Sequence, residues 1–264
     1  MLTNKFDPYQ HRNSSIHKLD PRVKVVITLL FIVANVLLPD GAWSGYMVAW
    51  GMVLLIAFRA QISVRLMLKR SLIILPFMLA AVTVMFSLPG EPIWTWHLGN
   101  QVVTISDAGL IRFLSILVRS WLSVQMAILL TMTTQFPDLM HALSHLRVPA
   151  ILVTIIAFMY RYLFVLVEEA MRLLRAREAR SARMDDSAGG GSLWWRAKIT
   201  GNMIGQLLVR SLDRSDRVYQ AMVSRGYDGR FLTLNPHQME RHDWVLAGVA
   251  LGGIVLIQII GRIM

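Results

Sequence analysis

The chain has 264 residues, of which 55% are hydrophobic, with a mean hydropathy of +0.51 and a formal net charge of +11. This composition is too apolar for an ordinary soluble domain, and the length allows several membrane crossings. The chain has no cysteine, which excludes disulfides and thiolate metal sites. Because its basic residues flank apolar stretches, they favour cytoplasmic loops of a membrane protein over a nucleic-acid-binding surface.

Five apolar segments predict membrane-crossing helices, since a bilayer core requires about 17 to 25 largely apolar residues per helix. The polar residues 1–20 precede them and lack the apolar core of a signal peptide, so we expect none. Asp20 suits an N-cap and Pro21 the first helical position of the first segment, while Pro76 should kink the third. The predicted segments are 23–38, 43–58, 72–88, 117–132 (within 108–134) and 244–260.

A sixth apolar segment, 150–167, is separated from these five by its charge context. Loops 39–43 and 89–107 contain no Lys or Arg, whereas 59–70 contains four. The positive-inside rule then places the N-terminus and loop 59–70 in the cytoplasm. If 150–167 also crossed, the 13 basic residues of the block 168–241 would lie outside. We therefore expect an interfacial helix there, five crossings and an external C-terminus.

The expected fold is an all-α membrane protein with about five transmembrane helices and a cytoplasmic domain of long amphipathic helices. The predicted domains are an N-terminal membrane domain (1–134), a cytoplasmic and interfacial domain (135–241) and a C-terminal transmembrane helix (242–264). A short helix after Pro137 presents Leu139, Leu143 and Leu146 at helical spacing.

Two long helices should follow, separated by the glycine-rich residues 185–192. The first runs from the apolar segment into Arg180, and the second covers about 194–224 and ends at Gly226. One stripe of the second helix is predicted to pack against a neighbour, with basic residues on roughly the opposite side. The stripe comprises Leu208, Leu212, Ser215, Tyr219 and Met222; the basic residues are Arg210, Arg214 and Arg217.

Similar arginine signatures occur at or near the ends of both long helices, at 176–181 and 224–227. Arginine can place a planar fork of five donors into a groove and bond carbonyls or carboxylates there. The alternative is a solvated basic face that favours the helix dipole and anionic lipid. The recurrence of the signature on both helices favours a docking function.

Four ordered blocks of the chain resemble the transmembrane T component of energy-coupling factor (ECF) transporters. They are Ser15-Ile16-His17-Lys18-Leu19-Asp20-Pro21-Arg22-Val23-Lys24, Tyr160-Arg161-Tyr162 with Glu168-Glu169, Ala179-Arg180-Ser181, and Ala221-Met222-Val223-Ser224-Arg225-Gly226-Tyr227. The opening Phe6-Asp7-Pro8-Tyr9 before Ser15 is similar to the cobalt/nickel branch. A T component serving a vitamin-type substrate is the alternative.

The resemblance implies a non-catalytic subunit of the bacterial cytoplasmic membrane that binds no cofactor itself. It couples two ABC-type ATPases to a small substrate-capturing membrane subunit. The first docking motif would be Ala179, Arg180 and Ser181, although Arg177 also fits; Ser181 suits the small third position. The second would be Ser224, Arg225 and Gly226. Leu139, Leu143, Leu208, Leu212, Tyr219 and Met222 are the candidate contacts with the substrate subunit.

Other candidate sites are weaker. His141 and His145 have metal-ligand spacing but no third ligand, and a structural role is favoured. Glu168 and Glu169 could be functional or could pair with Arg161 or Arg172. The sequence has no phosphate-binding P-loop. An interfacial enzyme acting on anionic lipid is the rival of another class, and an anchor for nucleic acid leaves the paired motifs unexplained.

Overall fold

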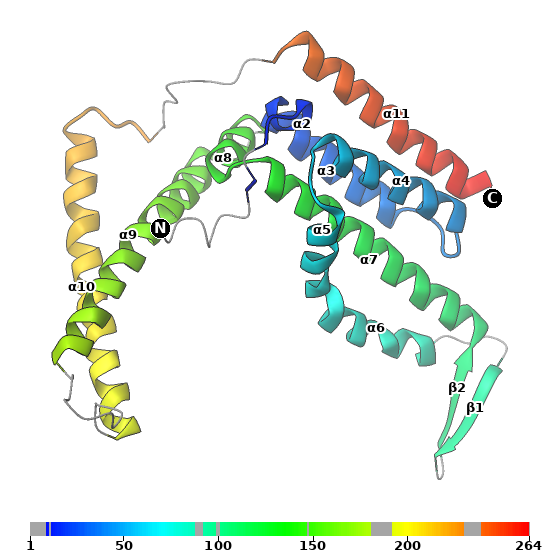
Figure 1. The fold of residues 1–264 in the computed structure, drawn as a ribbon, viewed down its shortest axis with the longest axis horizontal. Coiled ribbons are helices and arrows are strands. Elements are labelled where there is room, and N and C mark those ends of the chain that lie inside the picture. Colours follow the sequence, from blue (N-terminus) through cyan, green and yellow to red (C-terminus); the bar gives the residue numbers. More distant parts are fainter. Residues whose placement is uncertain are drawn as a thin grey trace. The chain divides into compact units, whose positions relative to one another are not determined.

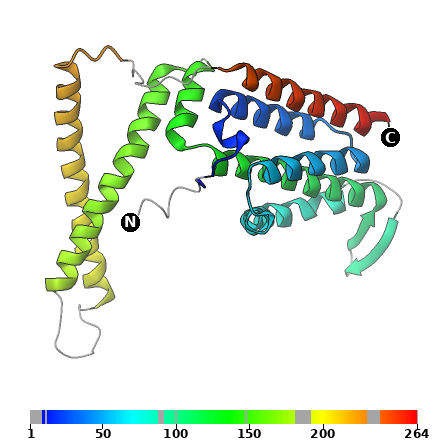
Figure 2. The ribbon, with the colours of Figure 1, turned by 45° about the horizontal axis from the view of Figure 1, so that its top comes forward.

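The structure is a computed structural model that describes residues 9–10, 12–87, 92–98, 101–146, 148–180, 192–229 and 239–263. The chain divides into two compact units. The first unit comprises Met1–Leu146 and Asn235–Met264, and the second comprises Arg147–Leu234. Figures 1 and 2 show the elements of each unit.

The first unit is a helical bundle with one β-hairpin. Its core lies between α3, α4, α7 and α11, where Phe31, Val53, Leu122, Leu129 and Ile257 are buried. Its elements in chain order are α2 Ser15–Lys18, α3 Pro21–Val36, α4 Trp43–Arg59, α5 Val64–Ser71, the 3₁₀ turn η1 Leu72–Ile74, α6 Leu75–Ser87, β1 Pro92–Leu98, β2 Gln101–Ser106, α7 Asp107–Thr133, α8 Phe136–His145 and α11 Arg241–Ile263.

The start of α3 follows the sequence prediction. The Asp20 side chain caps the helix by accepting a 2.8 Å hydrogen bond from the Arg22 backbone N–H. Pro21 occupies the first turn, where its missing N–H removes no helical hydrogen bond. The cap and the proline therefore fix where the first apolar helix begins.

The third apolar segment is bent, as Pro76 predicts. The short helix α5 leads through η1 into α6, and the chain changes direction at η1 (Figure 1). The pyrrolidine ring of a proline clashes with the carbonyl four residues earlier, and for Pro76 this is Leu72, the first residue of η1. The local 3₁₀ geometry accommodates the lost helical hydrogen bond.

The predicted loop 89–107 contains an antiparallel hairpin that the sequence analysis missed. Strand β1 pairs with β2 in a register that places His97 opposite Val102 and Leu98 opposite Gln101. The sequence signal was available: both strands are rich in Trp, Val, Ile and Thr, and Gly99-Asn100 lies between them.

Helix α7 carries a basic residue whose charge is paired inside the first unit. Arg119 Nη2 lies 2.7 Å from Asp40 Oδ1, and Arg119 Nε donates to the Tyr46 hydroxyl at 2.8 Å. Asn35 Nδ2 donates to the Arg119 carbonyl at 2.8 Å. These contacts tie the turn after α3 to α7, so an arginine within a predicted crossing has a local structural partner.

The second unit consists of α9 Ala150–Arg180 and α10 Leu193–Val223. The two helices run antiparallel and cross (Figures 1 and 2). Neither contains a fully buried residue. The predicted domain 135–241 also included α8, but α8 packs against α3 in the first unit.

Membrane crossing is supported by length and composition in the described residues. Four helices are long and apolar enough to cross, namely Val64–Phe86, Asp107–Thr133, Ala150–Arg180 and Arg241–Ile263. Trp43–Arg59 is a shorter apolar helix. The chain is a multi-pass, predominantly α-helical membrane protein, as predicted, although α3, which corresponds to the first predicted crossing 23–38, is not among the helices that meet these criteria. Because α9 also meets these criteria, its interfacial placement stays a prediction that depends on charge.

Candidate functional site

The hairpin of α9 and α10 carries both arginine signatures and is held together by polar contacts. Glu169 on α9 pairs with Arg210 on α10 through a 2.8 Å contact and with Arg172 on its own helix. The Glu169 side chain is 18% exposed. The ion pair with Arg172 confirms the structural alternative for this carboxylate, whereas Glu168 is exposed.

The two candidate arginines of the first signature lie in different environments. Arg177 is half-buried, and its Nη1 donates to Thr200 Oγ1 on α10 at 3.3 Å. Arg180 is the last residue of α9 and is exposed, as is Ala179. Ser181 lies outside the described residues. Arg177 thus contributes to the hairpin contact, while Arg180 projects from the helix end.

The second signature forms a complete Schellman motif at the end of α10. The Tyr227 N–H donates to the Met222 carbonyl at 3.1 Å and the Gly226 N–H to the Val223 carbonyl at 2.9 Å. Gly226 has a φ of +80°, a left-handed conformation that side chains with a Cβ rarely adopt. The Ser224 hydroxyl donates to the Ala221 carbonyl at 3.0 Å. The motif presents the exposed Arg225 at a defined helix terminus.

The two signatures lie at opposite ends of α10. The contact between Arg177 and Thr200 places the end of α9 beside the first part of α10, and Arg225 follows the last turn of α10. Thr200 and Arg225 are 25 residues apart. At 1.5 Å per helical residue this separation is about 37 Å. One protein groove therefore cannot hold both signatures, but two subunits can each hold one.

The predicted stripe on α10 is exposed and does not pack within the described chain. Leu208, Leu212 and Tyr219 are 61%, 58% and 62% exposed, whereas Met222 is half-buried. A neighbouring face is half-buried instead, on the side of Thr200. It comprises Ile199, Met203, Leu207, Ser211, Arg214, Val218 and Met222, so that Arg214, predicted on the basic side, lies on this half-buried face. The predicted stripe is therefore only one of two apolar faces of α10. The residues of the second face also recur at helical spacing in the sequence, so it could have been predicted as well.

Leu139 and Leu143, the other predicted contacts, lie on α8 in the first unit and are half-buried. The neighbouring residues Met140, His141 and Ala142 form the buried side of this helix. Part of each leucine side chain is therefore accessible. Of the six residues predicted to contact the substrate subunit, two lie in the first unit and four in the second.

Comparison with known proteins decides the family. The sequence profile of the CbiQ family, described as cobalt transport protein, matches residues 12–237. The chain belongs to the CbiQ family. This match covers most of the chain, both signatures included, and confirms the resemblance to the T component of ECF transporters.

Relatives support this placement across nearly the full CbiQ-type chain. The energy-coupling factor transporter transmembrane protein EcfT of Lacticaseibacillus paracasei is 28% identical, over 93% of this chain and 94% of its own. EcfT of Thermanaerovibrio acidaminovorans is also 28% identical, over 95% and 94%. An uncharacterized protein of Methanocaldococcus jannaschii is 27% identical, over 90% and 80%.

The N-terminal block of this CbiQ family member has a structural role within the first unit. Lys24 Nζ donates to the carbonyl oxygens of His17 and Thr133 at 3.0 and 3.2 Å. The Asp20 backbone N–H donates to Asp243 Oδ1 at 3.3 Å. Arg22 Nη2 lies 3.0 Å from His145 Nε2. The block thus joins the start of α3 to α7, α8 and α11.

The histidine pair on α8 is a close contact rather than a complete metal site. The rings of His141 and His145 have centroids 4.5 Å apart, and His145 Nδ1 lies 3.0 Å from the His141 carbonyl oxygen. Among the described residues, no group of three or more His, Cys, Asp or Glu side chains could hold a metal ion. The contact with Arg22 agrees with the structural interpretation of the pair.

Proposed function

We propose that this chain is the coupling subunit of an ECF importer for cobalt or nickel. In this proposal, the hairpin of α9 and α10 transmits the motion of the ATPases to a substrate-capturing membrane subunit. Cobalt is favoured by the description of the family to which the chain belongs. A non-catalytic role follows from membership of a transport family, with ATP hydrolysis in partner ATPases. The membrane is the bacterial cytoplasmic membrane, and the N-terminus faces the cytoplasm.

The observation that carries the proposal is the placement of Arg180 and Arg225. Both are exposed, Arg180 as the last residue of α9 and Arg225 two residues after α10, and about 37 Å of helix separates the two signatures. Two ABC-type ATPases, each with a groove lined by acceptors, fit this arrangement because each receives one guanidinium. Arg180 is the preferred first docking residue, since Arg177 already contacts Thr200.

The transmission path follows from the way the hairpin is built. The Glu169–Arg210 pair and the Arg177–Thr200 contact join α9 to α10. When the two ATPases close, the docked helix ends approach each other and the crossed helices shear. The exposed stripe that includes Leu208, Leu212 and Tyr219 is the surface that carries this motion to the substrate subunit. Leu139, Leu143 and Met222 extend the contact.

Affinity purification of the chain from its native membrane tests the docking proposal. Two ABC-type ATPase polypeptides and a small membrane protein should co-purify. The amount of ATPase that co-purifies with the Arg180→Ala/Arg225→Ala variant should be at least tenfold lower than with the wild type, while membrane insertion of the variant is unchanged. Arg177→Ala is the matched control and should retain them. Recovery of equal ATPase amounts with the double variant would exclude docking through these residues.

Uptake of radioactive cobalt by cells tests the substrate. Cells that lack the chain should lose high-affinity cobalt accumulation, and the wild-type chain should restore it where the Arg180→Ala/Arg225→Ala variant does not. Excess nickel should compete if both metals are carried. Unchanged cobalt uptake, together with loss of uptake of a vitamin, would reassign the importer to a vitamin-type substrate without affecting the docking result.

A further inference from the structure

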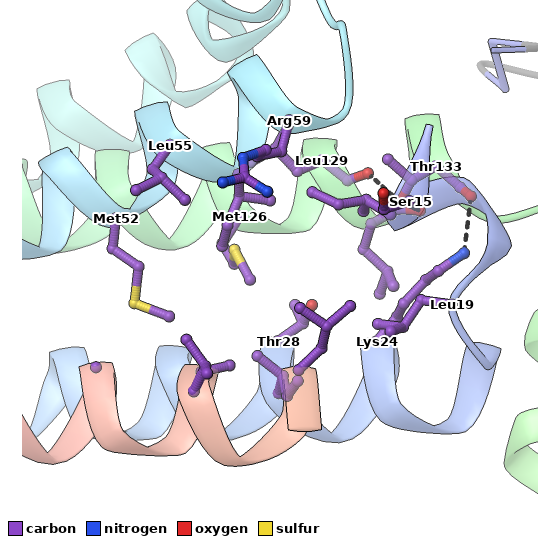
Figure 3. A pocket seen from close by; sticks show the side chains of 18 of the residues that line it. Ser15, Leu19, Lys24, Thr28, Met52, Leu55, Arg59, Met126, Leu129 and Thr133 are labelled. Carbon is purple, nitrogen blue, oxygen red and sulfur yellow. Dashed lines mark hydrogen bonds between the residues drawn. The ribbon is translucent and has the colours of Figure 1, made fainter. Parts of the chain in front are cut away.

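A cavity of about 540 Å³ lies among α2, α3, α4, α7 and α11 of the first unit (Figure 3). Its walls are mostly apolar, with Ile27, Leu55, Met126 and Val249 from four different helices. The few polar side chains of the wall are Ser15, Lys24, Thr28, Arg59 and Thr133. The coupling function proposed for the hairpin uses none of these residues.

The cavity has the length of one bilayer leaflet. Its lining runs along α11 from Leu246 to Leu256 and along α4 from Val48 to Arg59. At 1.5 Å per residue, these runs are about 15 and 16 Å long. The hydrocarbon core of a bilayer is about 30 Å thick, so one leaflet contributes about half of that depth. An acyl chain of one leaflet therefore matches the long dimension of the cavity.

The polar groups of the lining are concentrated at one end. Arg59 is the last residue of α4 and Thr133 the last of α7, while Lys24 lies in the first turn of α3 and Ser15 begins α2. The chain directions of these helices place the four positions toward the same end of the bundle. The positive-inside rule assigns this same end of the bundle to the cytoplasm.

The lining itself carries positive charge and no negative charge, although Asp20, Asp138 and Asp243 behind it act electrostatically on Lys24. None of the lining residues is Asp or Glu. Arg59 is exposed and forms no ion pair with another described residue. Lys24 uses two of its three ammonium donors on the His17 and Thr133 carbonyls. Figure 3 shows the hydrogen bond from Lys24 to Thr133 and the side chain of Arg59, both at the cavity.

We propose that this cavity binds one anionic phospholipid, with an acyl chain along α4 and α11 and its phosphate at Arg59. A guanidinium can bond two phosphate oxygens at once, and Lys24 adds a second positive charge to the lining. The acyl chain leaves one apolar environment for another, so it supplies fit and little net affinity. A preference of the cavity for one lipid over bulk lipid must therefore come from the headgroup, and the positive charge of the lining selects an anionic headgroup.

Native mass spectrometry of the purified chain in detergent tests this proposal with two lipids of identical acyl chains. The delipidated chain is mixed with dioleoylphosphatidylglycerol or dioleoylphosphatidylcholine, and the bound lipids are counted. One phosphatidylglycerol should be retained at least fivefold more strongly than phosphatidylcholine. Arg59→Gln should abolish that preference, whereas Arg59→Lys should keep most of it. Arg65→Gln is the control, because Arg65 is exposed but does not line the cavity.

A second variant tests the apolar part of the cavity. A Cβ at Gly51 would have no atom within 4 Å, so Gly51→Leu fills free space in the lining without a backbone clash. It should reduce retention of both lipids, and Gly51→Ala should not. Gel filtration and thermal unfolding verify that each variant is folded.

Three results would overturn the proposal. The first is an equal phosphatidylglycerol preference in wild type and Arg59→Gln. The second is complete suppression of that binding by millimolar inorganic phosphate, which would indicate a simple anion site. The third is wild-type retention of both lipids by Gly51→Leu. None of these results bears on docking through Arg180 and Arg225.

Discussion

In the first unit, Asp20, Lys24 and Asn35 are buried and hydrogen-bonded to groups on other elements, whereas the α9–α10 hairpin contains no fully buried residue. The first unit supplies partners for several of the polar groups that it removes from solvent, which favours stability in a low-dielectric environment, although the side-chain amide of the buried Gln125 has no hydrogen-bond partner among the described residues. Both units leave large apolar side chains exposed, but among the described residues only the first unit also has a buried core.

This difference teaches which part of the molecule depends on other proteins. Exposed apolar surface on one helix face is typical of an interaction site. The face with Leu208, Leu212 and Tyr219 and the two exposed arginines lie in the hairpin. Changes in the first unit should therefore affect folding, and changes in the hairpin should affect assembly.

The largest loss of stability is expected from Gly45→Val. A Cβ at Gly45 would lie 3.0 Å from Gly261 Cα, at the close contact of α4 with α11. The helices must move apart, which costs about 1–3 kcal/mol. Thermal unfolding in detergent should show a clear decrease in the midpoint. Gly248→Ala is the control, because its Cβ would have open space; a matching decrease there would refute the close-contact explanation.

A smaller loss is expected from Asp40→Ala. This change removes the partner of Arg119, whose side chain is 17% exposed. Because the Asp40 side chain is 39% exposed, solvent screens the pair and the cost is about 1 kcal/mol. Arg112→Ala should cost less in the same unfolding experiment, since Arg112 is more exposed and 3.8 Å from Asp40. Equal effects of the two variants would contradict the assignment of Arg119 as the principal partner.

Glu169→Gln should change the stability of the chain by less than about 0.5 kcal/mol, because its ion pairs involve exposed arginines. Its effect should appear in the hairpin, where Arg210 loses its carboxylate on α9. Distances between spin labels on α9 and α10 should become broader. Glu168→Gln is the control. If Glu168→Gln broadens the distance distribution by the same amount, a general loss of charge is responsible.

No loss of stability is expected from Leu208→Ser/Leu212→Ser, since both side chains are already exposed. The variant should unfold at the wild-type temperature but recover several-fold less of the small membrane subunit in affinity purification. Val209→Ser is the control, because Val209 is 58% exposed but lies off the stripe. If the double variant unfolds early, the stripe packs inside the protein and the contrast between the two units fails.

Local sequence signals predicted the helices well. Asp20 and Pro21 indicated the start of α3, Pro76 the bend before α6, and Gly226 the end of α10, because caps, prolines and left-handed glycines act over a few residues. The β-hairpin was missed because loop 89–107 was considered only for its charge. Its β-branched and aromatic residues were sufficient to suggest strands.

The arrangement of the α9–α10 hairpin was harder to predict, because it depends on which faces of these two helices meet. Helix α10 has two adjacent apolar faces, and the sequence of one helix does not tell which of them packs on α9. The contacts of Arg177 with Thr200 and of Arg210 with Glu169 select the face. The same pairing gives Arg177 a contact with Thr200 and leaves Arg180 exposed, which is why we propose Arg180 as the first docking residue.

Single-cysteine cross-linking in the assembled native complex tests the central claim most directly, because the chain has no cysteine of its own. Ala179→Cys and Ser224→Cys place a thiol beside each docking arginine, and Gln206→Cys places one at an exposed position in the middle of α10. The account predicts that the first two each cross-link to an ABC-type ATPase polypeptide and that Gln206→Cys does not. Equal cross-linking from all three positions, or none from the two helix ends, would contradict it.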